Sequence, residues 1–240
     1  MDAQVRIIDP KEVLKASARF DLIYKVELAK AWADGDAAAI REAEEAYLEM
    51  VRARNGFYED EPRRDTPKEF LESFRRTANS IRERGYDLSR PPIPVDERLE
   101  LLNGAHRLAA CIAYGKTCPF VLSDCWKAGG SVWKTFRKGH IHPAVEAWGI
   151  RRYLEMMPDG ALASAFGRLE DHPAQPFPDW TRRRGGLLLV KPFLTALWCR
   201  LTMSFKKGEK RAKAERRLLR EQKKISGYAA LAAYWKERAK

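Results

Sequence analysis

One stretch, residues 93–122, constrains the fold more than any other part of the sequence. It reads IPVDERLELLNGAHRLAACIAYGKTCPFVL, in which short apolar runs flank a segment rich in alanine. Residues 105–114 predict a helix that Gly115 ends, and the flanking runs predict short strands at 93–95, 99–102 and 119–122. The chain is therefore expected to contain a compact α/β unit whose helix begins directly behind Gly104.

Helical periodicity dominates the rest of the chain. Residues 11–33 and 36–54 predict two antiparallel helices that turn at Asp34-Gly35-Asp36. Thr66-Pro67 followed by Glu69 predicts the start of another helix, because this spacing forms a capping box. The sequence therefore predicts an α+β fold with a helical N-terminal hairpin, a small α/β core and a helical C-terminal region.

Changes in composition divide the chain into four segments. We expect an N-terminal helical region at 1–56 and a core at 57–125. A helical region with a Pro-rich linker follows at 126–180, and a basic helical tail covers 181–240.

The positive charge is concentrated in the tail. Of the 45 Lys and Arg and 33 Asp and Glu, residues 181–240 hold 18 and 4, a net charge of +14. The other 27 basic and 29 acidic residues leave the body at about −2. Any argument for a polyanionic partner or a membrane therefore concerns the tail.

The tail has three interpretations: a solvated helix, a nucleic-acid contact, or a membrane-surface anchor. Residues 185–205 are apolar but interrupted by Lys191, Pro192 and Arg200, which disfavours a membrane span. Residues 206–224 are highly charged. An apolar segment beside a polybasic one suits an anionic membrane surface, so 185–224 is favoured as an interfacial anchor. Nucleic acid is the less favoured partner, because charge without a groove-reading motif is weak support.

The cysteines and the N-terminus bear on location. Cysteines 111, 118, 125 and 199 form no CxxC pair, and MDAQVRIIDPKE does not resemble a signal peptide. We therefore expect a cytoplasmic protein, placed by its tail at the inner face of the membrane.

The junction Gly104-Ala105-His106-Arg107 predicts an anion site. Backbone N–H groups are unpaired where a helix begins, and the helix dipole is positive there, so phosphate is the natural guest. Gly104 and Ala105 allow close approach, Arg107 offers a forked donor, and His106 offers a donor or a proton shuttle. The alternative is that His106 caps the helix and Arg107 pairs with a surface acid.

The stretch from Phe70 to Leu122, about a fifth of the chain, resembles the ParB/sulfiredoxin superfamily. The features that carry the resemblance are SIRERG (80–85), PIPV (92–95), LELLNGAHRLAACIAYG (99–115) and PFVL (119–122). Members carry a G-x-[HR]-R motif at this junction, followed by an alanine-rich helix. The resemblance implies that Gly104, Ala105, His106 and Arg107 cradle nucleotide phosphates, with Asn103 beside them.

Departures from the family pattern narrow the function. Sulfiredoxins carry their nucleophilic cysteine at the position of Ala105, so redox chemistry is disfavoured. Residues 131–168 lack the basic pattern of a recognition helix, which weakens a chromosome-partition role. The resemblance is therefore closest to the ParB-like free serine kinases, and implies an ATP-dependent or other nucleotide-dependent kinase for a sugar or an amino-acid-like acceptor. Surface polysaccharide biosynthesis is the suggested setting, and the alternative is a ParB-type nucleotide-dependent DNA-binding protein.

A kinase needs a base near the acceptor, and Mg²⁺ across the phosphates. In the serine kinase relatives an acidic residue before the helix equivalent to 67–84 serves the acceptor. The matching loop is EDEPRRD (59–65), so Glu59 and Glu61 are the candidate catalytic carboxylates beside His106. The alternative for this loop is a solvated charged turn. No metal ligand is assigned by the sequence.

Overall fold

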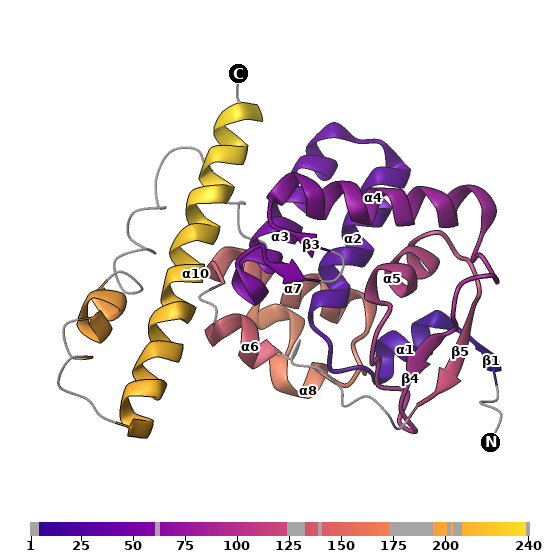
Figure 1. Ribbon diagram of the computed structural model, residues 1–240. Coiled ribbons are helices and arrows are strands. Elements are labelled where there is room, and N and C mark those ends of the chain that lie inside the picture. Colours follow the sequence, from indigo (N-terminus) through magenta and orange to yellow (C-terminus); the bar gives the residue numbers. More distant parts are fainter. Residues whose placement is uncertain are drawn as a thin grey trace.

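The computed structural model describes residues 5–60, 63–123, 133–138, 141–172, 194–200, 203 and 208–238. It is an α+β fold in which a small sheet lies at one edge of a mostly helical body (Figure 1). The elements are β1 (Val5–Ile8), α1 (Pro10–Ala16), α2 (Asp21–Asp34), α3 (Ala37–Asn55), β2 (Glu59–Asp60), β3 (Arg63–Arg64), α4 (Pro67–Arg84), β4 (Ile93–Val95), α5 (Ala105–Ala113), β5 (Cys118–Leu122), α6 (Trp133–Lys138), α7 (Pro143–Met156), α8 (Ala163–Phe166), a 3₁₀ turn η1 (Leu169–Asp171) and α10 (Gly208–Arg238).

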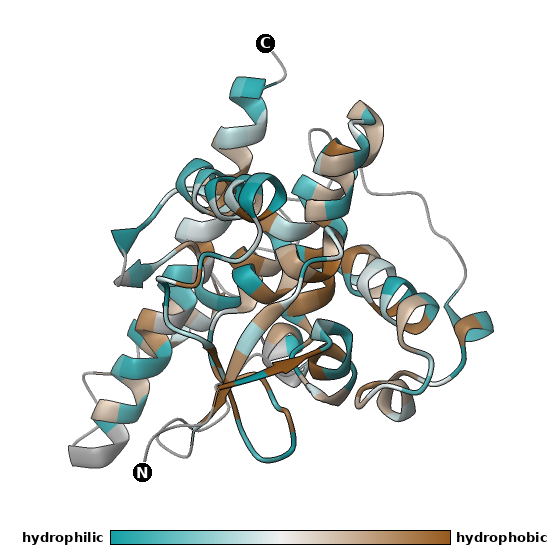
Figure 2. Cartoon of the chain, turned by 90° about the vertical axis from the view of Figure 1, so that its right-hand side faces the viewer, coloured by the Kyte–Doolittle hydropathy of each residue, from teal (hydrophilic) through white to brown (hydrophobic). Residues whose placement is uncertain are grey.

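The sheet has the order β1-β5-β4. β4 and β5 run parallel and are joined through α5, as the sequence predicts for an α/β unit. β1 pairs antiparallel with β5 and was not predicted, because its side chains are mostly exposed and VRII carries no alternating pattern. In Figure 2 the strands of this sheet are largely brown, the hydrophobic end of the scale, whereas β2 and β3 are teal.

The predicted strand at 99–102 is wrong. Only one bridge forms there, between Val95 and Leu101. The carboxylate of Asp96 accepts hydrogen bonds from the N–H groups of Arg98 and Glu100, and Leu99 has a φ of 62°. This tight turn leaves too little extended chain for a strand, so a loop delivers the chain to α5.

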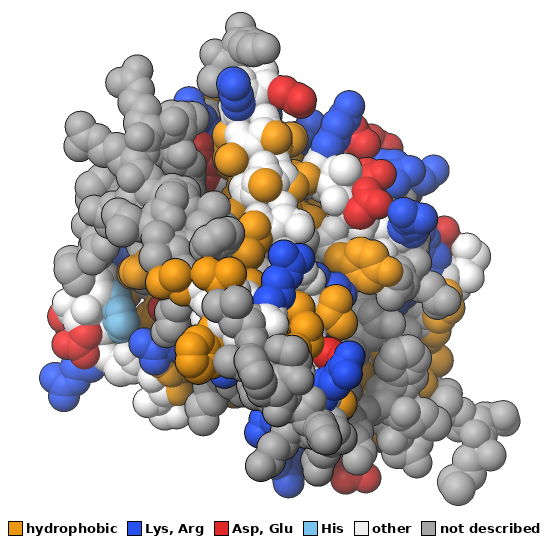
Figure 3. All heavy atoms as spheres, turned by 60° about the vertical axis from the view of Figure 1, so that its left-hand side comes forward, with side chains coloured by type: hydrophobic (Ala, Val, Ile, Leu, Met, Phe, Trp, Pro, Cys, Tyr) orange, Lys and Arg blue, Asp and Glu red, His pale blue; other side chains and the backbone are white. Residues whose placement is uncertain are grey.

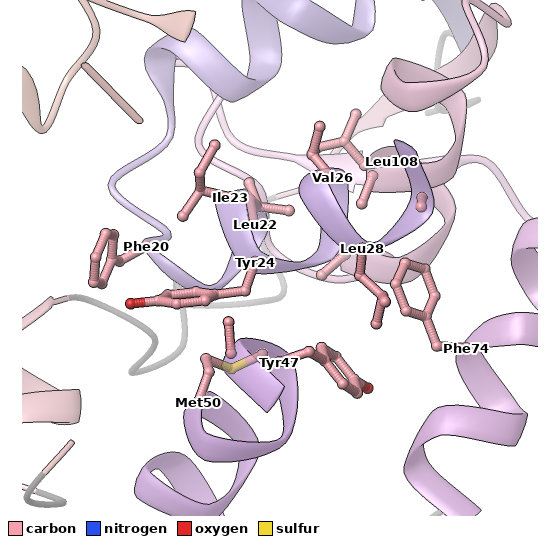
Figure 4. Packing of buried hydrophobic residues seen from close by; sticks show 14 of the residues in the cluster. Phe20, Leu22, Ile23, Tyr24, Val26, Leu28, Tyr47, Met50, Phe74 and Leu108 are labelled. Atoms are coloured by element: carbon pink, nitrogen blue, oxygen red, sulfur yellow. The ribbon is translucent and has the colours of Figure 1, made fainter. Parts of the chain in front are cut away.

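Helix α2 lies at the centre of the core. Its side chains are buried on nearly all sides, as expected for a helix enclosed by others. Figure 4 shows Leu22, Val26 and Leu28 of α2 among side chains from three further helices, Tyr47 and Met50 of α3, Phe74 of α4 and Leu108 of α5. The hydrophobic cluster includes residues of all four predicted segments, with Leu231 and Trp235 contributed by the tail.

The predicted helix at 11–33 is interrupted. It divides into α1 and α2, because the Ser17 hydroxyl and the Ala18 N–H both donate to the carboxylate of Glu100. The turn at Gly35 and the capping box of α4 are confirmed: Asp36 caps α3, and the Thr66 hydroxyl accepts from the Glu69 N–H.

The C-terminal helix α10 packs lengthwise against α3, beside the body (Figure 1). Small residues make the contact close: a Cβ on Gly56 would lie 2.8 Å from the Lys223 carbonyl oxygen. A Cβ on Gly227 would lie 3.1 Å from the Gly56 Cα. The Pro-rich linker falls almost entirely outside the described residues. In the part of the chain that the structure describes, no helix has the length and apolar character needed to cross a bilayer.

Candidate functional site

The start of α5 is shaped as the sequence predicts. Gly104 adopts a φ of 83°, which favours glycine because it has no Cβ. A Cβ there would also lie 3.0 Å from Nη2 of Arg107. The Asn103 side-chain oxygen accepts from the Gly104 N–H at 2.6 Å, and no side chain in the described part caps α5. The first-turn N–H groups of α5 are thus left without a side-chain acceptor, as an anion site requires.

This helix start opens into a pocket of about 480 Å³. Its walls come from the residues before α2, from α2, α3 and α4, from the β2–β3 ribbon and from residues 102–107. The volume lies in the range typical of small-molecule sites. The structure therefore brings Asn103, Gly104, Ala105, His106 and Arg107 together with Glu59 around one cavity.

Positive charge dominates the pocket wall. The only carboxylate among the described lining residues is Glu59, and the six cationic side chains are Arg19, Lys25, Arg54, Arg64, Arg90 and Arg107. Three further carboxylates face these cations from outside the lining: Asp21, Asp87 and Glu100. Within the described part of the chain, six cations against four carboxylates leave an excess of positive charge, which attracts anions.

Three of these cations meet at Asp21, on the floor of the pocket. Arg19 lies 2.9 Å from its Oδ2 and Arg54 lies 3.9 Å away, and Lys25 donates to the same oxygen. The Asp21 side chain is 0% exposed and that of Lys25 is 3% exposed. Burial opposes the ionisation of Asp21, but the three cations hold its pKa well below its usual range.

Lys25 is the most perturbed cation. Burial lowers its pKa to about 8; Arg54 and Arg19 act in the same direction, and Asp21 opposes them. Among the described residues Asp21 is its one hydrogen-bonding partner, although an ammonium carries three donors. Lys25 therefore has donor capacity left for a group inside the pocket.

His106 is packed among aromatic side chains. Its ring stacks on Phe74 at 4.7 Å, and its Nε2 lies 3.2 Å from the Tyr47 hydroxyl oxygen. Burial, helped by Lys25 and Arg64, lowers its pKa well below its usual range, so the imidazole is neutral at pH 7. The alternative that His106 caps α5 is wrong, because the helix has no side-chain cap.

Arg107 is held by neutral partners. Its Nη1 donates to the Tyr86 hydroxyl and to the Pro91 carbonyl, which ties α5 to the approach to β4. The alternative of a surface ion pair is not realised, since no carboxylate among the described residues pairs with it. Its charge is therefore left uncompensated beside the Gly104 backbone.

The predicted catalytic loop is a two-stranded ribbon in which Glu59 pairs with Arg64. Nη1 of Arg64 also donates to the Ser73 hydroxyl at 2.9 Å, and its buried Nε has no partner. Glu59 is thus fixed at the pocket wall by a cation. Glu61 lies outside the described residues.

The residues that could hold Mg²⁺ are few. The described part contains no group of three or more His, Cys, Asp or Glu side chains arranged for a metal ion. Glu59 could therefore contribute to holding Mg²⁺ only together with substrate phosphates, because Mg²⁺ is commonly held by one or two carboxylates and the phosphates of the substrate. We therefore derive no step through a metal.

Sequence reasoning missed the floor of the pocket. Arg19, Asp21 and Lys25 stand in an otherwise apolar segment, FDLIYKVEL and its approach. Two charges on a helix that must be buried, Asp21 and Lys25, with Arg19 just before it, were the available signal. Arg54 could not be paired with them from sequence, because it comes from the far end of α3.

Comparison of the chain with protein-family models, with curated proteins and with solved structures finds no match. The resemblance to the ParB/sulfiredoxin superfamily therefore rests on the residues between Phe70 and Leu122, and the function rests on the chemistry of the pocket.

Proposed function

We propose that the protein is a nucleotide-dependent kinase of a small molecule, built on a ParB/sulfiredoxin-like core. The observation that carries this proposal is one pocket lined both by the start of α5 and by Glu59, under an excess of positive charge. Phosphoryl transfer needs little covalent chemistry from the protein. It needs positioned phosphates, neutralised charge and a base near the acceptor.

The residues divide into two roles. The N–H groups at the start of α5, with Arg107 and Arg90, hold the nucleotide phosphates, of ATP or another nucleotide. Glu59, which pairs with Arg64 at the pocket wall, accepts the proton of the acceptor hydroxyl as the phosphoryl group arrives. Mg²⁺ would reach the site with the nucleotide phosphates. The acceptor class, a sugar or an amino-acid-like compound, and a place in surface polysaccharide biosynthesis rest on the resemblance.

His106 has a narrower role in this proposal than the sequence predicted. A neutral imidazole donates at most one hydrogen bond, and its Nε2 already faces the Tyr47 hydroxyl. We propose that it positions the first turn of α5 against α3 and α4. A proton-shuttling role remains a prediction of the motif.

The experiment that tests the proposal measures binding and turnover of ATP, ADP and CTP, each with Mg²⁺, with and without sugar and amino-acid acceptors. Glu59→Gln should retain nucleotide affinity and lose about 100-fold or more in turnover, the usual contribution of a general base. Glu72→Gln is the matched control, because Glu72 lies on the exposed side of α4 and pairs with Lys68.

The results separate the candidates. Acceptor-dependent ADP release that Glu59→Gln abolishes supports the kinase. CTP hydrolysis that DNA stimulates would instead favour the ParB-type DNA-binding alternative. Absence of nucleotide binding by the wild-type protein would overturn both, since both rest on the Gly104 motif.

We also propose a peripheral contact of the tail with anionic lipid, on a separate observation. Leu194 is 57% exposed, Trp198 64% and Leu219 59%, although they lie in apolar or amphipathic segments. Helix α10 exposes the basic side chains of Arg211, Lys213, Arg216 and Arg217. Figure 3 shows orange hydrophobic side chains interspersed with blue lysine and arginine side chains on this side of the molecule.

Apolar side chains beside basic ones supply the two attractions that interfacial binding needs. Trp198→Ala with Leu194→Ser should weaken sedimentation with vesicles containing phosphatidylserine. Leu88→Ser is the control, because Leu88 is 78% exposed but lies far from α10 in the chain. Equal sedimentation of all variants would contradict the membrane contact.

A further inference from the structure

The floor of the pocket carries a surplus of positive charge. The proposed phosphate site at the start of α5 does not use it. Arg19, Lys25 and Arg54 converge on the single carboxylate of Asp21, which one cation would neutralise. Glu100 reaches Arg19 electrostatically from the other side, but it accepts from Ser17 and Ala18 and does not line the pocket. Even with Arg19 counted as neutralised, Lys25 and Arg54 exceed Asp21 by one positive charge among the described residues.

Such an arrangement is unfavourable in a ligand-free protein. A buried charge loses its hydration and is retained only if partners replace it. The lowered pKa of Lys25 shows this cost, since its proton is held less tightly than in water. A negatively charged group in the pocket would remove the cost by filling the open donor positions of Lys25.

The floor is separate from the phosphate-holding start of α5. It is built from the residues before α2, from α2 and from the end of α3, whereas Arg90 and Arg107 come from the other wall. The β2–β3 ribbon, with Glu59 and Arg64, also lines the cavity. A ligand with one anionic group on the floor can thus present a hydroxyl within the same cavity as Glu59.

We propose that Lys25, Arg54 and Arg19 form a second anion subsite, which binds a carboxylate or a phosphate carried by the acceptor. This inference rests on the proposed kinase function and narrows its substrate class to hydroxy acids and phosphorylated or acidic sugars. The nucleotide and the acceptor are then both anions, held at opposite walls of one cavity.

The kinetic test uses matched acceptors, a neutral sugar against its 6-phosphate and its uronic acid, and glycerol against glycerate. The variants are Lys25→Met and Arg54→Gln, with Arg76→Gln on the exposed face of α4 as the control. The anionic member of each pair should have a KM at least about tenfold lower in the wild-type protein, as expected for a charge-assisted contact. Both floor variants should remove this preference and leave pyrophosphate affinity within about threefold.

Two results would overturn the subsite. One is equal use of neutral and anionic acceptors by the wild-type protein. The other is a loss of pyrophosphate affinity in the floor variants as large as their loss of acceptor affinity, which would assign the floor to the nucleotide. Arg54→Gln keeps the test decisive if Lys25→Met fails to fold, because the Arg54 side chain is 34% exposed.

A binding measurement separates this inference from the kinase proposal. Calorimetry with inorganic phosphate should give two sites in the wild-type protein and one in Lys25→Met. If the wild-type protein binds phosphate in this pattern but no nucleotide, the kinase fails and the subsite stands. Unchanged stoichiometry in both floor variants overturns the subsite, whatever the enzyme assay shows.

Discussion

Helices α2 and α3 carry two buried ion clusters, which differ in how completely their charges are paired. On α3, Arg52 and Glu49 are both 0% exposed, and the guanidinium donates to both carboxylate oxygens at 2.6 and 2.7 Å. The Arg52 guanidinium also lies 3.7 Å from the centre of the Tyr228 ring. This cluster is closed, with one cation matched to one anion beneath α10.

The cluster around Asp21 is open. It has three cations for one carboxylate and borders a cavity. Burial perturbs both clusters, but only in the open one does a cation, Lys25, have its pKa lowered. In the closed pair Glu49 overcomes burial and raises the pKa of Arg52. We infer a criterion from this difference. A buried charge that is fully paired stabilises the fold, whereas a surplus buried charge at a cavity marks a candidate binding site.

Glu49→Gln should give the largest effect, because it breaks the closed cluster and leaves Arg52 as a buried cation without its anion. The expected loss is about 3–5 kcal/mol in the free energy of unfolding. Urea denaturation followed by circular dichroism measures it. A loss below about 1 kcal/mol would show that water or Tyr228 compensates Arg52, and would break the contrast between the clusters.

Gly104→Ala should come next and act on the open side. A φ of 83° strains alanine, and its Cβ would lie 3.0 Å from Nη2 of Arg107. We expect a loss of about 1–2 kcal/mol in stability and at least about a tenfold loss in pyrophosphate affinity. Gly35→Ala is the matched control, with a φ of 78° and open space around it. It should lose stability alone, and equal losses of affinity in both variants would contradict the phosphate site.

The pH dependence of acceptor binding tests whether the charge of Lys25 in the open cluster contacts the acceptor. The charged groups facing Lys25 are Asp21, Arg19 and Arg54, with the neutral His106. Its pKa is about 8, so the free protein loses this charge as the pH rises through 8. If an acceptor carboxylate requires the charged form, its affinity should fall about tenfold between pH 7 and pH 9.

The wild-type KM for glycerate, measured across this range, tests the expectation. Arg54→Gln removes a neighbouring positive charge, so it should raise the pKa of Lys25 and shift the profile to higher pH. A KM that does not change with pH would exclude Lys25 from the acceptor site.

The smallest effect is expected at the exposed pair of Arg211 and Glu215 on α10, whose nitrogen and oxygen lie 3.0 Å apart. Glu215→Gln should change the free energy of unfolding by less than about 0.5 kcal/mol, because water screens the pair. The same denaturation assay measures it. A larger loss would mean that exposed pairs stabilise this fold as buried ones do.

Local signals in the sequence predicted local structure well. Thr66, Pro67 and Glu69 predicted the start of α4, and Gly104 predicted the backbone that opens α5. The fold class is confirmed as α+β, and Glu59 lies in the same pocket as the motif. The start of α4 and the turn at Gly104 share a cause, since capping and left-handed turns depend on residues only a few positions apart.

Features created by tertiary contact were not predictable. β1 is an edge strand that exists because β5 offers it a partner, and the strand expected at 99–102 gave way to the Asp96 turn. The floor of the pocket needs Arg54 to meet Asp21 across two helices. No spacing rule in the sequence brings those two residues together.

The packing of α10 has a consequence for the order in which the protein is made. Lys223 lies over the Tyr58 ring at 4.5 Å, and Arg238 pairs with Glu44, so α10 braces the base of the ribbon that carries Glu59. During synthesis, α3 and the β2–β3 ribbon leave the ribosome long before α10. Gly56 therefore stays exposed until α10 packs against it. The nascent chain can therefore assemble its sheet early, but the pocket wall that carries Glu59 is braced only after α10 has left the exit tunnel.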